Sequence, residues 1–472
     1  MRRSTALLVS LALAPTSASA WDTPIRWIAA GSGSIPADNQ VSIEQDMALA
    51  ERTFGPGGVL LYSGGPGSHG VQVDAGNTAA SSTDRLLARL GGLFDPRGGR
   101  SARYRKTVLS PAGPATAEGV GAAIQRALDQ KGSSPLTVYL AGHGQVGQAA
   151  RDNTVALWEQ SSLSVADLAE LLDASTGGRP VRVVVTSCYS GGFAELAFTD
   201  ANPEHGAPGS PRCGFFATTW DLQASGCDPN PDRRTQEGYG MHFLNALQAR
   251  DRDGRTLPLR TLDLDGDGTI SMLEAHTRAR VASEAMDVPT TTSERWLRAT
   301  APESGPSRAP KLPEEDAVVA ALARRLGMTG REDDARARLD TLERKAEALR
   351  AEVDDEAKAE HAAYRQAAAE LLARWPVLDD PWHPAFGQAL ATHRKAIGKH
   401  LDRSKAYARY LAARRRADTL DAQIFAARRQ SAPYERLVRA LDTRILAGRL
   451  QARGGADWAT YESFLACERT RP

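Results

Sequence analysis

Two apolar segments of this 472-residue chain each run into one reactive side chain flanked by small residues. Residues 136–140 lead to His143 and Gly144, and residues 181–185 lead to Cys188. A cysteine thiol needs a nearby base to become a nucleophilic thiolate, and small neighbours let a substrate carbonyl approach. The pattern predicts nucleophilic catalysis. Cys188 would be the nucleophile and His143 the general base and acid, with the Gly144 and Cys188 amides as oxyanion donors.

A second motif has the composition of a calcium-binding loop. Residues 263–274 fill every position of the twelve-residue EF-hand pattern. The predicted oxygen ligands are Asp263, Asp265, Asp267, the Thr269 carbonyl, Ser271 and Glu274. A proline at 258 excludes a standard entering helix, so we expect a structural Ca²⁺ site of weak affinity. The alternative is an acidic loop that only caps the helix expected at 271–286.

Composition excludes several classes of protein. Lys and Arg number 58 against 57 Asp and Glu, and a formal charge of +1 gives no field for gathering nucleic acid. No apolar run approaches the roughly 20 residues of a membrane-spanning helix. The glycine-rich residues 64–70 lack the lysine of a phosphate loop, and the histidines do not cluster at zinc spacing. We therefore expect no nucleic-acid partner and no organic cofactor, and the proposed attack by Cys188 on a carbonyl would suit protein or peptide substrates.

Hydrophobic periodicity predicts the elements that must position the reactive residues. Strands are expected at the short apolar runs 25–30, 58–62, 136–140 and 181–185. Helices are expected between them at 41–54, 116–130 and 165–174. This alternation predicts an α/β fold with a mostly parallel sheet covered on both faces. If the strands before His143 and Cys188 are neighbours, both side chains emerge at the same edge.

Together, the two motifs resemble the legumain-like family of caspase-fold cysteine peptidases. That family places His-Gly after one strand and Cys after the next. Residues 27–32 with 60–62 look like its first two strands, and 216–219 with 224–227 look like its substrate-binding side. The resemblance covers roughly residues 25–250. It implies a caspase-like three-layer αβα sandwich and a secreted cysteine endopeptidase.

The chain departs from that family at its specificity residues. Gly33 and Ser42 stand near the positions of its supporting asparagine and its pocket arginine, and Tyr189 replaces the acidic residue after the nucleophile. Specificity for asparagine is therefore not implied. The substrate-pocket residues that the sequence suggests are Ser225 and Glu237.

The N-terminus has the order of a secretory signal peptide, with Arg2 and Arg3 before an apolar stretch and small residues up to Ala20. The alternative is a buried N-terminal helix. We expect cleavage after Ala20 and a periplasmic or secreted protein in an oxidising compartment.

Cysteine spacing predicts one disulfide in such a compartment. Cys213 and Cys227 enclose 13 residues and are expected to be bonded to each other. Cys188 would stay free as the nucleophile, and Cys467 is expected to be unpaired.

Composition changes after a Pro-rich segment. Residues 301–313 predict a linker between a catalytic domain at 21–300 and a helical domain at 314–472. In the tail, apolar residues recur every three or four positions, which predicts three or four antiparallel helices, the first partly coiled coil. Breaks are expected at 375–376, 381–384 and 431–433.

The role of this tail is open on sequence grounds. Residues 21–310 carry 26 basic and 32 acidic side chains, whereas 311–472 carry 30 and 25. Legumain-like enzymes of animals and plants carry a helical C-terminal segment over the cleft. The resemblance implies that the tail docks on the catalytic domain and restrains access to Cys188. The alternative is an independent interaction or oligomerisation module.

Two other functions also remain open. One is a catalytically silent calcium-binding module with a partner-binding tail, and the other is a transpeptidase that uses the same acyl-enzyme. Iodoacetamide labelling distinguishes the silent module from a peptidase. A low-pKa Cys188 would react at mildly acidic pH, whereas a buried structural thiol would not.

Overall fold

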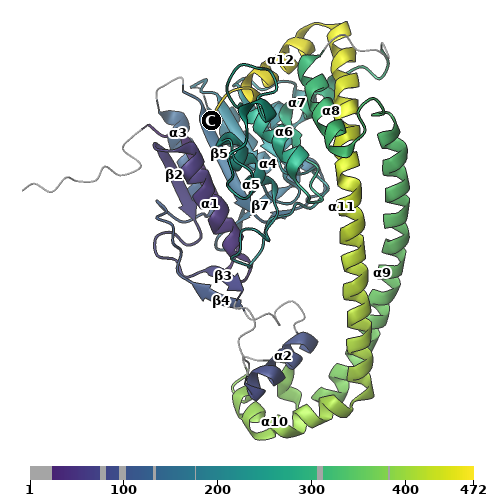
Figure 1. Cartoon of the computed structure of the whole chain (residues 1–472). Coiled ribbons are helices and arrows are strands. Elements are labelled where there is room, and N and C mark those ends of the chain that lie inside the picture. Colours follow the sequence, from purple (N-terminus) through teal and green to yellow (C-terminus); the bar gives the residue numbers. More distant parts are fainter. Residues whose placement is uncertain are drawn as a thin grey trace, which may run out of the picture.

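The computed structural model describes residues 24–74, 81–94, 102–130, 134–175, 177–305, 312–380 and 383–472. The expected signal peptide, and residues 306–311 of the expected linker, lie outside this range. The described chain is a mixed α/β unit with a mostly parallel central sheet, followed by a helical C-terminal region (Figure 1).

The central sheet has six strands in the order β11-β10-β9-β5-β1-β2, all parallel to their neighbours except β11. Their bounds are β1 Trp27–Ser32, β2 Gly58–Tyr62, β5 Leu136–Gly142, β9 Val181–Val185, β10 Arg212–Phe216 and β11 Thr290–Thr291. The four strands predicted from apolar runs are all present. Two small sheets flank the main one, formed by β3 Val71–Asp74 with β4 Ala102–Arg105, and by β6 Gly144–Gln145, β7 Thr154–Leu157 and β8 Ser161–Ser164.

Helices α1 Val41–Phe54, α3 Ala117–Asp129 and α4 Val165–Asp173 lie where the amphipathic pattern predicts them. Thr116 caps α3 by accepting the Gly119 N–H at 3.1 Å. The other helices of this region are α2 Ser82–Phe94, α5 Tyr239–Leu247, α6 Met272–Ala282 and α7 Thr292–Thr300.

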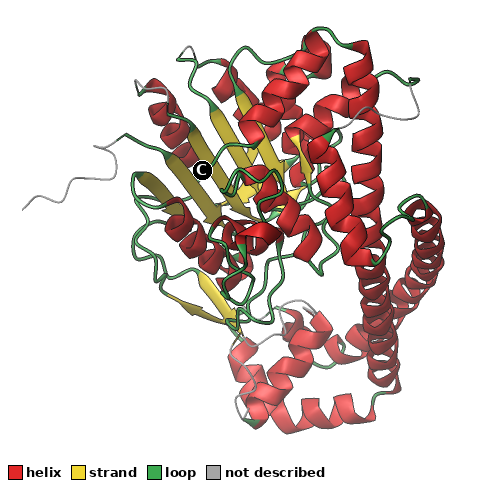
Figure 2. Cartoon of the chain, turned by 45° about the horizontal axis from the view of Figure 1, so that its top comes forward, coloured by secondary structure: helices red, strands yellow, loops and turns green. Residues whose placement is uncertain are grey.

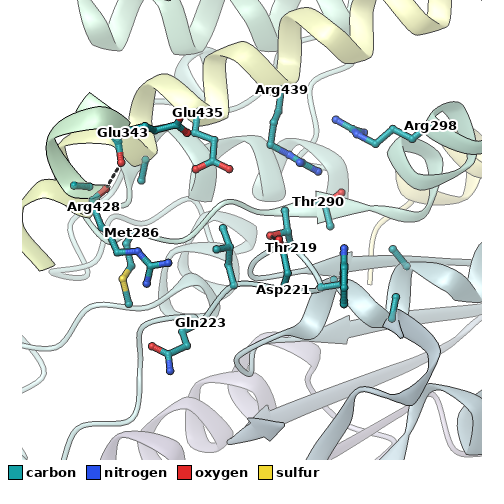
Figure 3. Close-up of a pocket in the computed structure, with 18 of the residues that line it drawn as sticks. Thr219, Asp221, Gln223, Met286, Thr290, Arg298, Glu343, Arg428, Glu435 and Arg439 are labelled. Atoms are coloured by element: carbon teal, nitrogen blue, oxygen red, sulfur yellow. Dashed lines mark hydrogen bonds between the residues drawn. The ribbon is translucent and has the colours of Figure 1, made fainter. Parts of the chain in front are cut away.

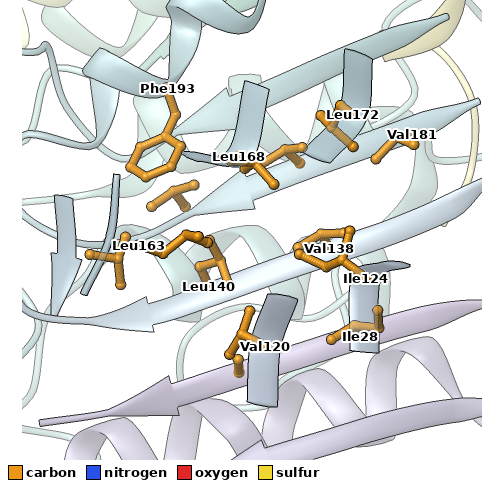
Figure 4. Packing of buried hydrophobic residues seen from close by; sticks show 14 of the residues in the cluster. Ile28, Val120, Ile124, Val138, Leu140, Leu163, Leu168, Leu172, Val181 and Phe193 are labelled. Carbon is orange, nitrogen blue, oxygen red and sulfur yellow. The ribbon is translucent and has the colours of Figure 1, made fainter. Parts of the chain in front are cut away.

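Alternate residues of each strand point to opposite faces, so the sheet is buried on both sides (Figure 2). On one face, Ile28 and Val138 pack with the apolar residues of α3 and α4 (Figure 4). On the other face, Tyr139 and Val184 pack with those of α1, α5 and α6. This two-sided burial holds the carboxyl ends of β5 and β9 rigidly in place.

The helical region contains α8 Pro313–Leu326, α9 Asp334–Leu372, α10 Phe386–Arg403, α11 Lys405–Arg453 and α12 Ala456–Glu468. Helices α9 and α11 form a long antiparallel hairpin (Figure 1), and the 49 residues of α11 span about 73 Å. The break expected at 375–376 is confirmed, because α9 ends at Leu372.

The break expected at 431–433 is wrong, because Pro433 lies inside α11. A proline in a helix interior costs about 3 kcal/mol. Leu437 and Val438, one turn further on, pack with Val319 and Leu322 of α8. This burial offsets the cost and keeps α11 continuous.

The expected Cys213–Cys227 disulfide is also wrong. Cys213 on β10 is bonded to Cys467 on α12, with 6.0 Å between their Cα atoms and 254 residues between them in sequence. Cys213 is buried where β10 faces α12. Cys227 is exposed in the segment that follows β10. Cys188 and Cys227 are the free cysteines.

The C-terminal helix is joined to the α/β half of the chain (residues 24–300) by more than this disulfide. The buried Glu468 carboxylate accepts the Ser293 N–H at 2.9 Å and the Thr292 and Ser293 hydroxyls at 2.9 and 2.6 Å. Burial raises the pKa of Glu468 to about 7. Apolar residues of α12 pack with Phe198 and Trp296. The tail therefore shares a core with the sheet.

Helix α2 holds the far end of the hairpin. It leaves the β3–β4 arm and packs its leucines against α10 and the ends of α9 and α11 (Figure 1). The Tyr410 hydroxyl donates to the Gly92 carbonyl at 2.7 Å, and Arg89 pairs with Asp402 at 2.9 Å. The far end of the hairpin thus packs on α2, and its near end packs on the core of the α/β half.

We predict that Cys467→Ser lowers the free energy of unfolding by about 2–5 kcal/mol, because it releases the covalent link between strand β10 and helix α12. Calorimetry under oxidising conditions measures the effect, with Cys227→Ser as the matched control that leaves stability unchanged. A disulfide-linked peptide containing Cys227 in a non-reducing digest would contradict the observed pairing.

Candidate active site

His143 and Cys188 occupy equivalent positions on neighbouring strands. Strands β5 and β9 pair in parallel with Leu140 opposite Val185, and each reactive residue lies three positions beyond this pair. The two following loops touch, because a Cβ atom added to Gly144 would lie only 2.0 Å from the Cys188 carbonyl oxygen. Glycine is therefore required at 144. The structure brings both residues to the same carboxyl edge.

The Gly144 N–H is not used by its own ladder. Gly144 lies opposite Val155 in the antiparallel β6–β7 pair, and the Ala156 N–H donates to the His143 carbonyl at 2.9 Å. Gly144 and Val155 therefore form a non-hydrogen-bonded pair of this antiparallel ladder. In such a pair, each N–H points away from the partner strand. This amide is available as an oxyanion donor beside Cys188.

The surroundings of His143 define its tautomer. Its Nε2 lies 2.8 Å from the Asp38 carbonyl oxygen and 2.9 Å from Gln40 Oε1. A carbonyl only accepts, so Nε2 carries the proton and Nδ1 keeps the lone pair of the neutral ring. Nδ1 is thus the atom that can take a proton from a thiol.

The sequence analysis missed Asp38 and Gln40. Gln40 holds the N-cap position of α1, yet its side chain makes no capping bond. Glutamine is unusual there, since short side chains such as Ser and Asp cap best. That mismatch is the local signal that this residue has another role.

The Cys188 thiol is half-buried and contacts one neighbouring residue through two polar atoms. The Ala224 N–H donates to Sγ at 3.4 Å, and Sγ donates to the Ala224 carbonyl at 3.5 Å. Burial raises the pKa of the thiol, the Ala224 N–H lowers it and the Asp287 carboxylate raises it, and the net shift is upward. The upward shift favours the protonated thiol, whereas the peptidase hypothesis from the sequence predicts a low pKa for Cys188.

The backbone turns sharply at Tyr189, directly after the nucleophile. Its φ of 58° lies in the left-handed region, which is strained for a non-glycine residue. The Tyr189 N–H donates to the Leu222 carbonyl at 2.8 Å. This bond ties the turn to the 219–225 segment and fixes where the thiol points.

A small cavity of about 20 Å³ lies beside the thiol. Its lining includes Ser225, as the sequence suggests, and also Asp46 and Cys227, which the sequence analysis did not place there. The volume suits about one water molecule. The cavity is too small for a side chain of a bound peptide.

Glu237, the other suggested pocket residue, is not in this lining. Its carboxylate accepts a hydrogen bond from His242 Nε2 at 2.5 Å and pairs with Arg252. Asp46, by contrast, pairs with Arg233 and has its second oxygen 3.5 Å from a Cβ position on Gly240. Asp46 is thus the carboxylate that borders the cavity.

A larger cleft of about 1060 Å³ lies between the α/β half and the hairpin (Figure 3). The 219–223 segment forms one wall, and Figure 3 shows Arg428, Glu435 and Arg439 of α11 pointing into the cleft from the other. Gln223 in this lining directly precedes Ala224, which contacts the Cys188 thiol. The tail therefore borders a cleft near Cys188, and none of its described residues lines the small cavity.

The acidic loop brings three of its six predicted ligands together. Carboxylate oxygens of Asp263, Asp265 and Asp267 all lie within 4.8 Å of one another. The Gly268 N–H donates to Asp263 Oδ2 at 3.0 Å, and its φ of 82° allows the sharp turn. Hard oxygen donors in this arrangement fit a Ca²⁺ ion.

Ser271 and Glu274 instead form a capping box at the start of α6. Glu274 Oε2 accepts the Ser271 N–H at 2.8 Å, and its Oε1 accepts the Leu264 N–H at 2.6 Å. Glu274 therefore ties the loop to the start of α6, and its carboxylate is not among the three that lie together. The loop is preceded by a short turn, Leu259–Thr261, in place of an entering helix.

No family model matches this chain, and no curated protein matches it significantly. Among the described residues, no helix has the length and apolar character needed to cross a bilayer.

We predict that Ca²⁺ at a hundredfold excess over its dissociation constant stabilises the protein by about 2.7 kcal/mol. Glu274→Gln removes the expected bidentate ligand and should remove most of the shift in melting temperature. Asp253→Asn, an exposed carboxylate just before the loop, is the matched control. Identical melting curves in chelator and in millimolar Ca²⁺ would exclude the site.

Proposed function

We propose that this chain is a caspase-like cysteine endopeptidase that hydrolyses peptide bonds through an acyl-enzyme on Cys188. The observation that carries the proposal is the equivalent placement of His143 and Cys188 beyond the paired residues Leu140 and Val185. The protonated Nε2 of His143 adds support, because it leaves Nδ1 as the basic atom.

The proposed reaction uses the groups already described. As Sγ of Cys188 attacks the scissile carbonyl carbon, the thiol proton passes to Nδ1 of His143. The Gly144 and Cys188 amides stabilise the oxyanion. His143 then gives its proton to the leaving amine, and water, deprotonated by the same ring, releases the acyl group from sulfur.

The His143 ring needs to be held still for both transfers. The Asp38 carbonyl and the Gln40 side chain accept from Nε2, the ring nitrogen that takes no part in the proposed proton transfers. The same two acceptors stabilise the imidazolium that forms when Nδ1 takes a proton. In this scheme Asp38 and Gln40 take the place of the asparagine that Gly33 cannot supply. They act as positioning residues.

The substrate class follows from the space around the thiol. A cleft of about 1060 Å³ is large enough for an extended peptide, and its wall continues into Ala224 at the thiol. The Cys213–Cys467 disulfide suits an oxidising compartment, which supports a secreted or periplasmic enzyme. The acidic loop at the start of α6 would hold Ca²⁺ as a structural ion.

A catalytically silent module is the alternative that the test must exclude, since a protonated thiol beside a closed cavity also suits one. We predict that Cys188→Ala and His143→Ala each lower hydrolysis of denatured casein at least about 1,000-fold. Both melting temperatures should stay within a few degrees of wild type. Gln40→Ala should lower the rate about tenfold, because it only supports the ring.

Cys227→Ala is the matched control, because it removes the other free thiol of the cavity and should keep the rate within a few-fold. Wild-type hydrolysis by Cys188→Ala would overturn the proposed mechanism. Absence of hydrolysis by the wild-type chain on every peptide of a broad library would favour the silent module. Transfer of the acyl group to an added amine would indicate transpeptidation.

A further inference from the structure

One arginine of the tail is buried behind the wall that holds the nucleophile. Arg436 on α11 is 1% exposed, and its guanidinium donates to the Asp287, Ala285 and Ser283 carbonyls at 2.6, 2.6 and 2.8 Å. It also donates to the Arg280 carbonyl at 3.0 Å. The acceptors lie at the end of α6 and in the segment 283–287 that follows it. Arg436 therefore fixes the course of this segment.

Burial of this charge is unusual enough to need an explanation. Burial lowers the pKa of Arg436 to about 10, so the side chain still carries its charge at neutral pH. A buried charge is tolerated only where its donors are satisfied, and here backbone carbonyls satisfy them. Removal of the guanidinium would leave these buried carbonyls without their partner.

The segment held by Arg436 presents Asp287 to the active-site wall. Asp287 is fully buried, and its Oδ1 accepts the Ser225 N–H at 2.7 Å. Its Oδ2 has no hydrogen-bond partner within the described part of the chain. Burial raises the pKa of Asp287 to about 6, Arg436 acts against this shift and Glu237 adds to it.

Ser225 follows Ala224 in the chain, and Ala224 is the residue that contacts the Cys188 sulfur through its N–H and its carbonyl. A continuous series of hydrogen bonds and chain neighbours therefore links Arg436 on α11, the 283–287 segment, residues 224–225 and the Cys188 thiol. The 283–287 segment behind this wall is thus held by one residue of the tail.

We propose that Arg436 is a positioning residue for Cys188, and that the tail completes the active site through it. The effect of Arg436 on catalysis rests on the proposed peptidase function. A positioning role for the tail differs from the expectation that the tail restrains access to the thiol. Loss of Arg436 would release the 283–287 segment and weaken the hydrogen bond from the Ala224 N–H to sulfur.

The test follows the rate of Cys188 alkylation by iodoacetamide against pH, in the full-length protein with Cys227→Ser to remove the other free thiol. The Ala224 N–H favours the thiolate, so its loss should raise the pH of half-maximal alkylation. For Arg436→Met we expect an upward shift of about half to one pH unit. Arg444→Met is the matched control, because Arg444 lies on the same helix and pairs with Asp316 at the surface.

Further variants separate positioning from a general loss of stability. Asp287→Ala removes the acceptor of the Ser225 N–H and the negative charge together, so its midpoint should lie above that of Asp287→Asn, which removes the charge alone. Asp287→Asn keeps an acceptor for the Ser225 N–H and removes the negative charge near the thiol, so its midpoint should not rise. In hydrolysis, Arg436→Met should lower kcat about tenfold or more with little change in KM.

Alkylation needs no turnover, so the two proposals can fail separately. A shifted profile in a chain that hydrolyses no peptide would retain the positioning role and reject the peptidase. A wild-type profile for folded Arg436→Met would overturn the positioning role. If Arg436→Met does not fold, equal midpoints for Asp287→Ala and Asp287→Asn would overturn it.

Discussion

The parallel, in-register pairing of β5 with β9 is the constraint on which the candidate site depends. It places His143 three residues beyond Leu140 and Cys188 three residues beyond Val185, its paired neighbour. The next pair, β9 with β10, brings Phe216 level with Val185, so the 217–225 segment emerges at the same edge. A slip of one residue in either pair would turn every following side chain to the other face. The apolar layers on both faces of the sheet oppose such a slip and so maintain the register that places the site residues.

The tail is part of this arrangement. The Cys213–Cys467 disulfide, the Glu468 carboxylate at the start of α7 and the buried Arg436 all join C-terminal helices to the core of the α/β half. Buried charges of this kind contribute little net stability, yet removal of one partner leaves the other buried and unpaired. A chain truncated in the Pro-rich segment would lack all three connections. Such a truncation is expected to disorder the wall behind Cys188, whereas removal of an inhibitory segment would leave that wall intact.

Periodicity in the sequence predicted much of the sheet and its helices, because each of those elements has a local signal. Helices α1, α3 and α4 have regular apolar faces, and Thr116 marks a helix start by its own side chain. The pairing of Cys213 with Cys467 has no local signal, since it depends on how 254 intervening residues fold. Arg436 lies among many charged residues of a long helix and resembles a surface arginine. Pro433 looks like a helix break because the packing that offsets its cost comes from a separate helix.

The claim that most needs direct evidence is that Cys188 itself forms the acyl-enzyme. The mature protein can be mixed with denatured casein, stopped in acid within its first turnovers, digested and examined by mass spectrometry. The account predicts a casein-derived acyl group in thioester linkage on the peptide that contains Cys188, which hydroxylamine releases. Peptide hydrolysis without any adduct on Cys188, or with the acyl group on Cys227 instead, would contradict it.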